Sequence, residues 1–134
     1  MFARPVLRRQ IGADGPRAAD DVWDRYVRPA RWPEWSPQIR SVDYPRELLA
    51  AGTSGVVHGP AGLRVRFQVI DVAPGQPVRS WLWSASALGV ELTLAHTVEA
   101  TATGTRTGLT IEGFAPAVIA YLPAAQWALH RLVR

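Results

Sequence analysis

The chain has 134 residues, 48% of them hydrophobic and 19% charged, which predicts one folded domain spanning residues 1–134 rather than a disordered segment. It contains no cysteine, which excludes disulfides, thiolate nucleophiles and cysteine-containing metal sites. The net charge of +4 comes from arginines dispersed along a chain that has no lysine and no asparagine, so we expect no nucleic-acid partner and attribute the usage to a G+C-rich bacterial genome.

The N-terminal third is expected to contain a first strand over residues 4–11, an amphipathic helix and a short helix. Residues 4–11 alternate weakly, and Pro16 marks the start of a helix because proline suits a first helical position. Apolar side chains then recur every three or four residues from Arg17 to Val27, which predicts an amphipathic helix. Three further prolines allow only a one-turn helix over residues 29–32, and the chain should turn sharply at the aromatic corner of residues 32–35.

From about Gln38 onward the pattern favours strands. Six are expected, separated by glycine and proline turns: Ile39–Tyr44, Thr53–His58, Leu63–Val72, Val78–Ala85, Val90–Ala100 and Thr105–Phe114. In the third strand Val65 and Phe67 alternate with arginines, and in the fifth Leu94 and His96 alternate with polar residues. Alternation with hairpin-length loops is typical of an antiparallel sheet that has one apolar and one wet face.

A second long helix is predicted from Pro116 to Arg134. Its apolar face should contain Ile119, Leu122, Ala125, Leu129, Leu132 and Val133. Pro123 interrupts the pattern, so either the helix kinks near residues 119–123 or a new helix begins at Pro123. This is the only predicted element long enough to lie across the apolar face of the sheet.

The order of these elements and several short motifs resemble the START-like polyketide cyclase/dehydrase superfamily (SRPBCC), which includes the birch-pollen-allergen type of fold. The motifs span nearly the whole chain: DVWD at 21–24, RWPEWSP at 31–37, GTSG at 52–55, DVAPG at 71–75, HTVE at 96–99 and GTR at 104–106. The resemblance implies an α+β helix-grip fold, in which a curved seven-stranded antiparallel sheet surrounds a long C-terminal helix, with two short N-terminal helices and an internal cavity for apolar molecules. It does not identify a reaction, because the superfamily includes cyclases, dehydratases, lipid carriers and hormone receptors.

We therefore expect a small apolar or aromatic ligand between the sheet and the terminal helix. The candidate ligand-binding residues are Trp35, Phe67, Trp83, His96, Ile119, Leu122 and Gln126. Trp35 is expected to neighbour the cavity and Trp32 to plug the open end of the sheet. Trp81 and Trp83 share one face of their strand, and periodicity leaves open whether they face inward or stack outside on arginines.

Three functions remain open at this stage. The leading one is ligand binding by encapsulation; the second is a polyketide cyclase or dehydratase in which His96 or a bound water moves protons. The third is an interaction module without a ligand. His96 is the only candidate catalytic residue, and a core histidine bonded to a neighbouring strand is the competing interpretation.

The expectations on metals, cofactors and cellular location depend on features that the sequence lacks. His58 is expected at an exposed turn and His130 at a helix terminus, so the three histidines lack metal-ligand spacing and we expect neither a metal nor another cofactor. The sequence shows neither a secretory signal nor a membrane span, so we expect a cytoplasmic protein; a homodimer is left open.

Overall fold

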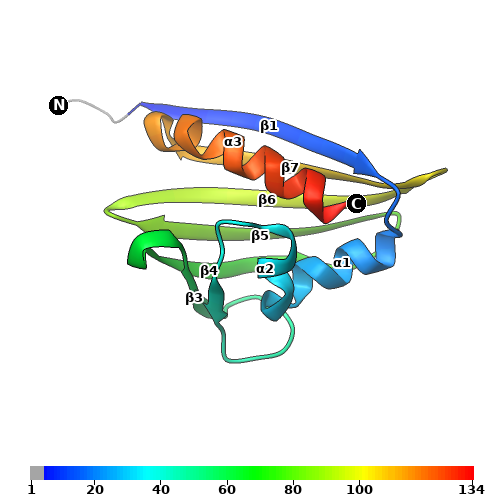
Figure 1. Cartoon of the computed structure of the whole chain (residues 1–134), viewed down its shortest axis with the longest axis horizontal. Helices are drawn as coiled ribbons and strands as arrows, with labels where there is room; N and C mark the ends of the chain where they lie inside the picture. The colour runs from blue at the N-terminus through cyan, green and yellow to red at the C-terminus, as the bar shows by residue number, and fades with distance from the viewer. Residues whose placement is uncertain (1–4) are drawn as a thin grey trace.

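The computed structural model describes residues 5–134, so the first residue of the expected N-terminal strand, Arg4, lies outside the described residues. The elements follow one another along the chain as shown in Figure 1: β1 (Val6–Gly15), α1 (Ala19–Val27), η1 (Pro29–Arg31), α2 (Trp32–Trp35), β2 (Ser41–Asp43), β3 (Ser54–His58), η2 (Pro60–Gly62), β4 (Arg64–Ala73), β5 (Val78–Ala87), β6 (Val90–Thr101), β7 (Gly104–Phe114) and α3 (Ala115–Leu132). The strands form one seven-stranded antiparallel sheet in the order β1-β7-β6-β5-β4-β3-β2. The predicted α+β class is confirmed.

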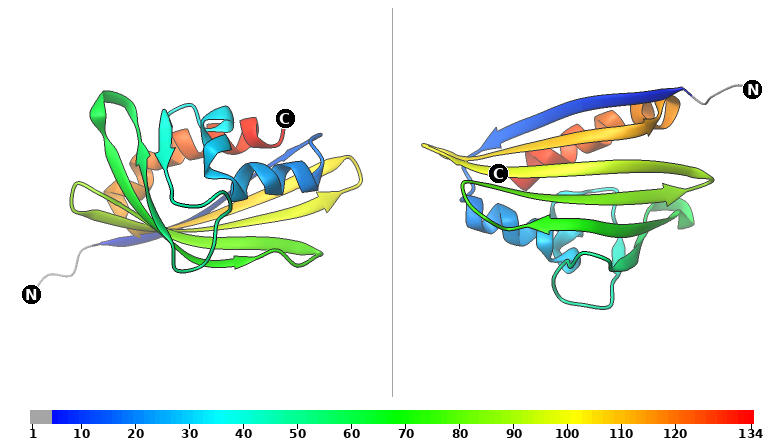
Figure 2. Two further views of the ribbon diagram at one scale, coloured as in Figure 1. Left: turned by 90° about the horizontal axis from the view of Figure 1, so that it is seen from below. Right: turned by 180° about the vertical axis from the view of Figure 1, so that it is seen from behind.

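The helices lie together on one side of the curved sheet, and Figure 2 shows the opposite side uncovered by helices. α3 packs most extensively against β1 and also contacts β7, whereas α1 contacts β6 and β7. The terminal helix therefore covers only part of the apolar face. The N-terminal helices cover a further part of this face, and most of their own aromatic side chains are buried against it.

The predicted alternation along the strands is confirmed. Phe67 and Val69 of β4 are buried, and so are Leu94, His96 and Val98 of β6, while the residues between them are exposed or half-buried. The β4–β5 register shifts between Val69 and Asp71 through a bulge, which leaves Ile70 exposed.

The end of α3 is fastened to α1 and to the end of β1. Arg25, which is buried, donates hydrogen bonds to the carbonyl oxygens of Leu132 at 2.8 Å and Arg131 at 3.2 Å. These carbonyls belong to the last turn of α3 and have no acceptor role within the helix itself. At Gly15 a Cβ atom would lie only 2.3 Å from the Val133 carbonyl oxygen, so this close approach requires glycine.

α3 runs without a break through Pro123, so the predicted alternative of a new helix at that residue is wrong. Pro123 is exposed, which allows the carbonyl that it leaves unpaired to reach water. No helix within residues 5–134 is long and apolar enough to cross a membrane.

Candidate functional site

Seven aromatic side chains pack against one another on the inner side of the sheet, and we call them the aromatic cluster: Tyr26, Trp32, Trp35, Phe67, Trp81, Trp83 and His96. Three come from α1 and α2, and four come from β4, β5 and β6. Neighbouring ring centroids lie 4.5 to 6.2 Å apart, and all seven side chains are buried. Trp81 and Trp83 therefore face inward, which answers the question that periodicity left open.

Trp32 and Trp35 occupy different places in the cluster. Trp32 Nε1 donates to the Tyr26 carbonyl at 2.8 Å and Trp35 Nε1 donates to the Arg25 carbonyl at 3.1 Å, which ties α2 to the last turn of α1. The Trp32 ring contacts three rings of the sheet at 5.3 to 5.8 Å, whereas the Trp35 ring meets the Tyr26 ring edge-on at 5.4 Å. Trp32, which was expected to plug the open end of the sheet, therefore packs on the aromatic rings of β4 and β5, whereas Trp35 packs on α1.

His96 contacts two tryptophans of β5, whose rings also stack on each other. Trp81, its register partner, stacks on the imidazole with a centroid separation of 4.5 Å and an interplanar angle of 8°. Trp83 Nε1 donates to His96 Nε2 at 2.9 Å. Because an indole nitrogen can only donate, Nε2 carries a lone pair and the proton of the neutral ring is on Nδ1. Burial lowers the pKa of His96 to about 3, so the ring is neutral at pH 7.

Two buried N–H groups of the cluster have no hydrogen-bond partner among the described residues: His96 Nδ1 and Trp81 Nε1. An unpaired buried donor costs about 1–3 kcal/mol, and native proteins contain few of them. Both groups lie on the inner side of the sheet and within one stacked pair of rings. The pair is therefore the feature of the interior that most requires a binding partner.

Tyr26 and Tyr121 bring two hydroxyl groups to the same region, and the sequence analysis singled out neither. Tyr26 Oη lies 2.6 Å from Thr107 Oγ1, which donates its only hydrogen to the Thr97 carbonyl at 2.9 Å, so Tyr26 is the donor. Burial raises the pKa of both phenols, that of Tyr121 to about 12, and the nearby Tyr121 raises that of Tyr26 further. Both phenols are thus neutral. Tyr121 could have been found because it lies three residues after Val118 on the buried face of α3.

The face that α3 turns toward the sheet differs from the predicted one. Its buried residues are Val118, Ala125, Ala128, Leu129 and Leu132. Ile119 is 59% exposed, so its predicted place on the sheet-facing side of the helix is wrong. Leu122 is half-buried against the core, as the prediction required. Gln126 Nε2 donates to the Gly12 carbonyl at 2.9 Å, so its amide is bound at the β1 edge rather than directed at the interior.

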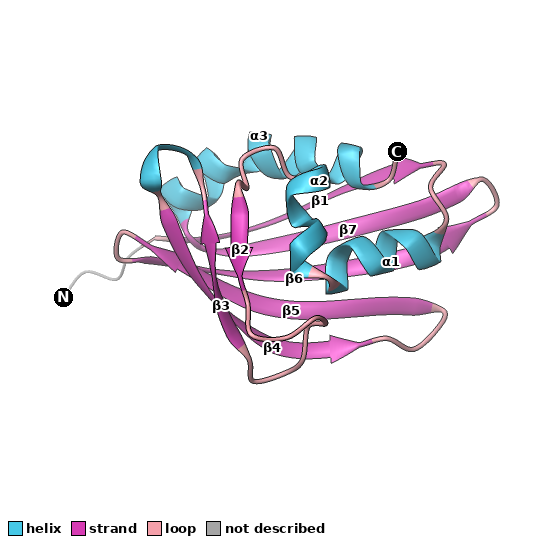
Figure 3. Ribbon diagram, turned by 60° about the horizontal axis from the view of Figure 1, so that its bottom comes forward, coloured by secondary structure: helices cyan, strands magenta, loops and turns pink. Residues whose placement is uncertain are grey.

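The inner face becomes less covered toward η2 and the first turns of α3, which lie at the same end of the molecule in Figure 3. The inward-facing apolar residues there are only half-buried: Val65, Ala85, Leu92, Tyr121 and Leu122. Along β5 the inward-facing side chains change from Trp81 and Trp83 to Ala85, so they are smaller toward this end and fill less of the space under the helices. We call these five residues the half-buried rim.

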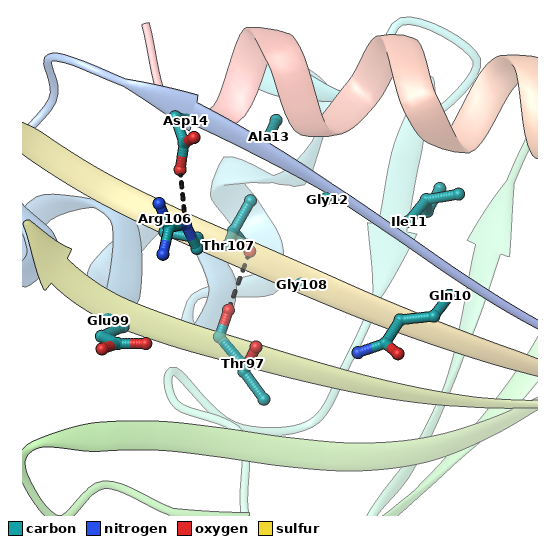
Figure 4. A pocket seen from close by; sticks show the side chains of 10 residues that line it. All are labelled: Gln10, Ile11, Gly12, Ala13, Asp14, Thr97, Glu99, Arg106, Thr107 and Gly108. Carbon is teal, nitrogen blue, oxygen red and sulfur yellow. Dashed lines mark hydrogen bonds and ion pairs between the residues drawn. The ribbon is translucent and has the colours of Figure 1, made fainter.

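The pockets with described volumes lie on the outer face or at the margin of the sheet. One of about 540 Å³ lies over β1, β7 and β6, where Gly12 and Gly108 are paired (Figure 4). Arg106 and Asp14 form an ion pair of 2.9 Å at its margin, and both side chains are more than 60% exposed. Another pocket of about 520 Å³ is lined by residues of β3 to β6, most of them outward-facing, and by Phe67 of the aromatic cluster. Neither coincides with the unpaired donors of the aromatic cluster.

The other two histidines lie apart from the cluster. His58 Nε2 lies 2.7 Å from Asp43 Oδ2 across β2 and β3, and His130 Nε2 lies 3.1 Å from Gln126 Nε2 at the end of α3. Within residues 5–134, no group of three or more histidine and acidic side chains is placed to hold a metal ion.

No protein-family model and no curated protein matches the chain, whereas many solved structures do. A hypothetical protein from Helicobacter pylori is 16% identical with a TM-score of 0.76, over 97% of this chain and 86% of that one. Ara h 8.0201 is 12% identical with a TM-score of 0.68, over 93% of this chain and 95% of that one. A norcoclaurine synthase point mutant from Thalictrum flavum, solved with a transition-state analogue, is 17% identical with a TM-score of 0.66, over 98% of this chain and 96% of that one. At such identities the similarity shows the fold alone.

Proposed function

Because the chain has the helix-grip fold of the START-like (SRPBCC) superfamily, we propose that it binds a small apolar or aromatic molecule on the inner side of its sheet. The ligand lies between the half-buried rim and the aromatic cluster, with Phe67 and Leu122 among its neighbours. The driving force is removal of apolar surface from water, and a few polar groups orient the molecule.

The proposal rests mainly on one observation, the pair of unpaired N–H groups on His96 and Trp81. Both groups are buried among aromatic rings and are adjacent through the stacking of their rings. A domain that needed only a packed core would gain stability from apolar groups at these places. Polar donors retained in an apolar interior are what a binding site for a mainly apolar molecule requires.

The charge of the region favours a neutral ligand. His96 is neutral because burial lowers its pKa, and the two phenols are neutral because burial raises theirs. The buried arginines already face carboxylates, since Arg25 Nε lies 3.8 Å from Glu34 and Arg79 pairs with Asp20. An ionised ligand would therefore enter the interior without a free counter-charge, which is costly.

The alternative of a cyclase or dehydratase has no specific observation in its favour. A general base works best when its pKa lies near the working pH, whereas burial lowers the pKa of His96 to about 3. Its Nε2 lone pair is also occupied by the Trp83 indole. Binding is therefore the function that the geometry supports best.

Titration with 2-isopropenylnaphthalene, followed by ligand-observed NMR, tests the proposal. Ala85→Phe narrows the rim and should abolish binding, whereas Ser86→Phe, at the next residue and facing outward, should leave binding unchanged. Leu122→Trp adds a large side chain to the rim from α3, so the proposal can still be tested if Ala85→Phe does not fold. The proposal fails if the wild-type protein does not bind the probe, or if well-folded Ala85→Phe and Leu122→Trp proteins bind it as the wild type does; in that case the interaction module without a ligand is favoured.

A further inference from the structure

The unpaired polar groups of the aromatic cluster are all of one hydrogen-bonding type. An indole N–H donates and cannot accept, so Trp81 offers a donor only. His96 Nε2 receives the Trp83 N–H, which leaves the ring to offer only Nδ1–H. Within the described part of the cluster, no buried side-chain acceptor is left without a partner.

The geometry alone fixes this donor character. If His96 were protonated at Nε2, two N–H groups would face each other across 2.9 Å, so the contact with Trp83 requires the Nδ1–H form. The other indoles of the cluster are excluded as donors to a ligand. Trp32 and Trp35 donate to backbone carbonyls of α1, at 2.8 and 3.1 Å respectively.

The two donors are neighbours in space because Trp81 and His96 are register partners on adjacent strands and their rings are stacked 4.5 Å apart. A carbonyl oxygen has two lone pairs and can accept from two donors that approach from one side. An alcohol oxygen also accepts, but it brings a hydrogen of its own, which two N–H donors cannot accept.

The charge of the ligand follows from the same surroundings. A carboxylate needs a cation or several donors when it is buried, and the buried Arg25 and Arg79 are already paired with Glu34 and Asp20 respectively. An uncharged carbonyl oxygen needs only the donors that are present. The flat aromatic walls suit a planar, aromatic body attached to that carbonyl.

We propose that the ligand is an uncharged aromatic carbonyl compound, such as an aryl ketone or a quinone, whose carbonyl oxygen accepts hydrogen bonds from His96 Nδ1–H and Trp81 Nε1–H. This inference rests on the proposed function, because it names the ligand class of the same interior site. Tyr121 of α3 belongs to the rim, and the Tyr26 ring of the cluster contacts His96 at 4.8 Å.

The test compares two probes of the same shape, 2-acetylnaphthalene and 2-isopropenylnaphthalene, which differ only in a C=O or a C=CH₂ group. Calorimetry should show the ketone binding about tenfold more tightly, the effect expected for a gained hydrogen bond to an otherwise unpaired buried donor. With protein labelled by ¹⁵N at histidine and tryptophan, the ketone should move the N–H signals of His96 and Trp81 downfield, and the hydrocarbon should not.

Variants separate this inference from the proposed function. Trp81→Phe keeps an aromatic ring but removes one donor, and the double variant His96→Phe/Trp83→Phe removes the other without freeing the Trp83 N–H. Each should lower the ratio of ketone affinity to hydrocarbon affinity below the wild-type value. His58→Phe, on the far strand pair, should keep the full preference. Equal affinity for both probes in the wild type would overturn the inference while leaving the proposed function intact. Failure of both probes to bind would overturn the proposed function and the inference with it.

Discussion

Replacing His96 by glutamine is expected to flatten the dependence of stability on pH between pH 7 and pH 5. Burial lowers the pKa of this histidine to about 3 in the folded protein, whereas the unfolded chain titrates near the ordinary value of 6.5. Below about pH 6.5 the unfolded chain therefore binds a proton that the folded chain does not, so the free energy of unfolding decreases as the pH decreases. With these values the His96 contribution lost between pH 7 and pH 5 is about 2 kcal/mol. For a chain of 134 residues this lowers the Tm by roughly 7 °C.

Urea unfolding at pH 7, 6 and 5 measures the effect. Glutamine suits the site because its oxygen can accept from the Trp83 indole and its amide keeps a donor. The exposed His130→Gln variant is the matched control and should keep the wild-type slope. Carboxyl groups titrate in all three proteins, so the difference between His96→Gln and the other two isolates the buried imidazole. If all three lose the same free energy within about 0.5 kcal/mol, His96 is solvated or paired in the folded protein and the reasoning is refuted.

Two further substitutions test the packing around the site. Arg25→Met removes the donors to the Leu132 and Arg131 carbonyls, although it also removes the cost of burying the arginine charge. Urea unfolding should show a free energy of unfolding lower by about 2 kcal/mol, and amide exchange in the last turn of α3 should be faster. A decrease below about 0.5 kcal/mol would contradict this role of Arg25. Tyr26→Phe removes one donated hydrogen bond to Thr107 but keeps the ring, so urea unfolding should show a loss of about 1 kcal/mol, and a loss as large as that expected for cavity formation, about 3 kcal/mol, would mean that the hydroxyl has other partners.

The strands could be predicted from the sequence because their signal is local. Val65 and Phe67 alternate with arginines, and such an alternation assigns the two faces of a strand without knowledge of its neighbours. A one-turn helix was expected over residues 29–32 and a sharp turn at residues 32–35, but residues 32–35 form the helix α2 after η1. Pro33 is compatible with α2 because it lies in the first turn, where a backbone N–H has no partner within the helix. The side of α3 that faces the sheet was harder to predict. Its first turns contain apolar residues on several sides of the helix, so the apolar pattern does not single out one face, and Ile119 was placed on the wrong one.

Four members of the aromatic cluster were among the residues predicted from the sequence, but their hydrogen bonding was not predicted. His96, Trp83, Phe67 and Trp35 were singled out from their strands and from the aromatic corner, and they do lie together in the aromatic cluster. Gln126 was selected from its helical position, yet its amide bonds to the backbone of β1. Nothing in a helical position distinguishes an amide directed at a cavity from one directed at the edge of a sheet.

The amino-acid sequence alone determined the order of the elements, the inward faces of β4 and β6 and the absence of thiol chemistry, since each depends on neighbours along the chain or on composition. Only the tertiary structure decided that Trp83 bonds to His96 Nε2, that Trp81 stacks on the same ring and that Tyr26 donates to Thr107 Oγ1. These contacts join residues separated by a hairpin or by most of the chain. Their hydrogen-bonding state depends on distances of a few tenths of an ångström, which a period of two or 3.6 residues does not specify.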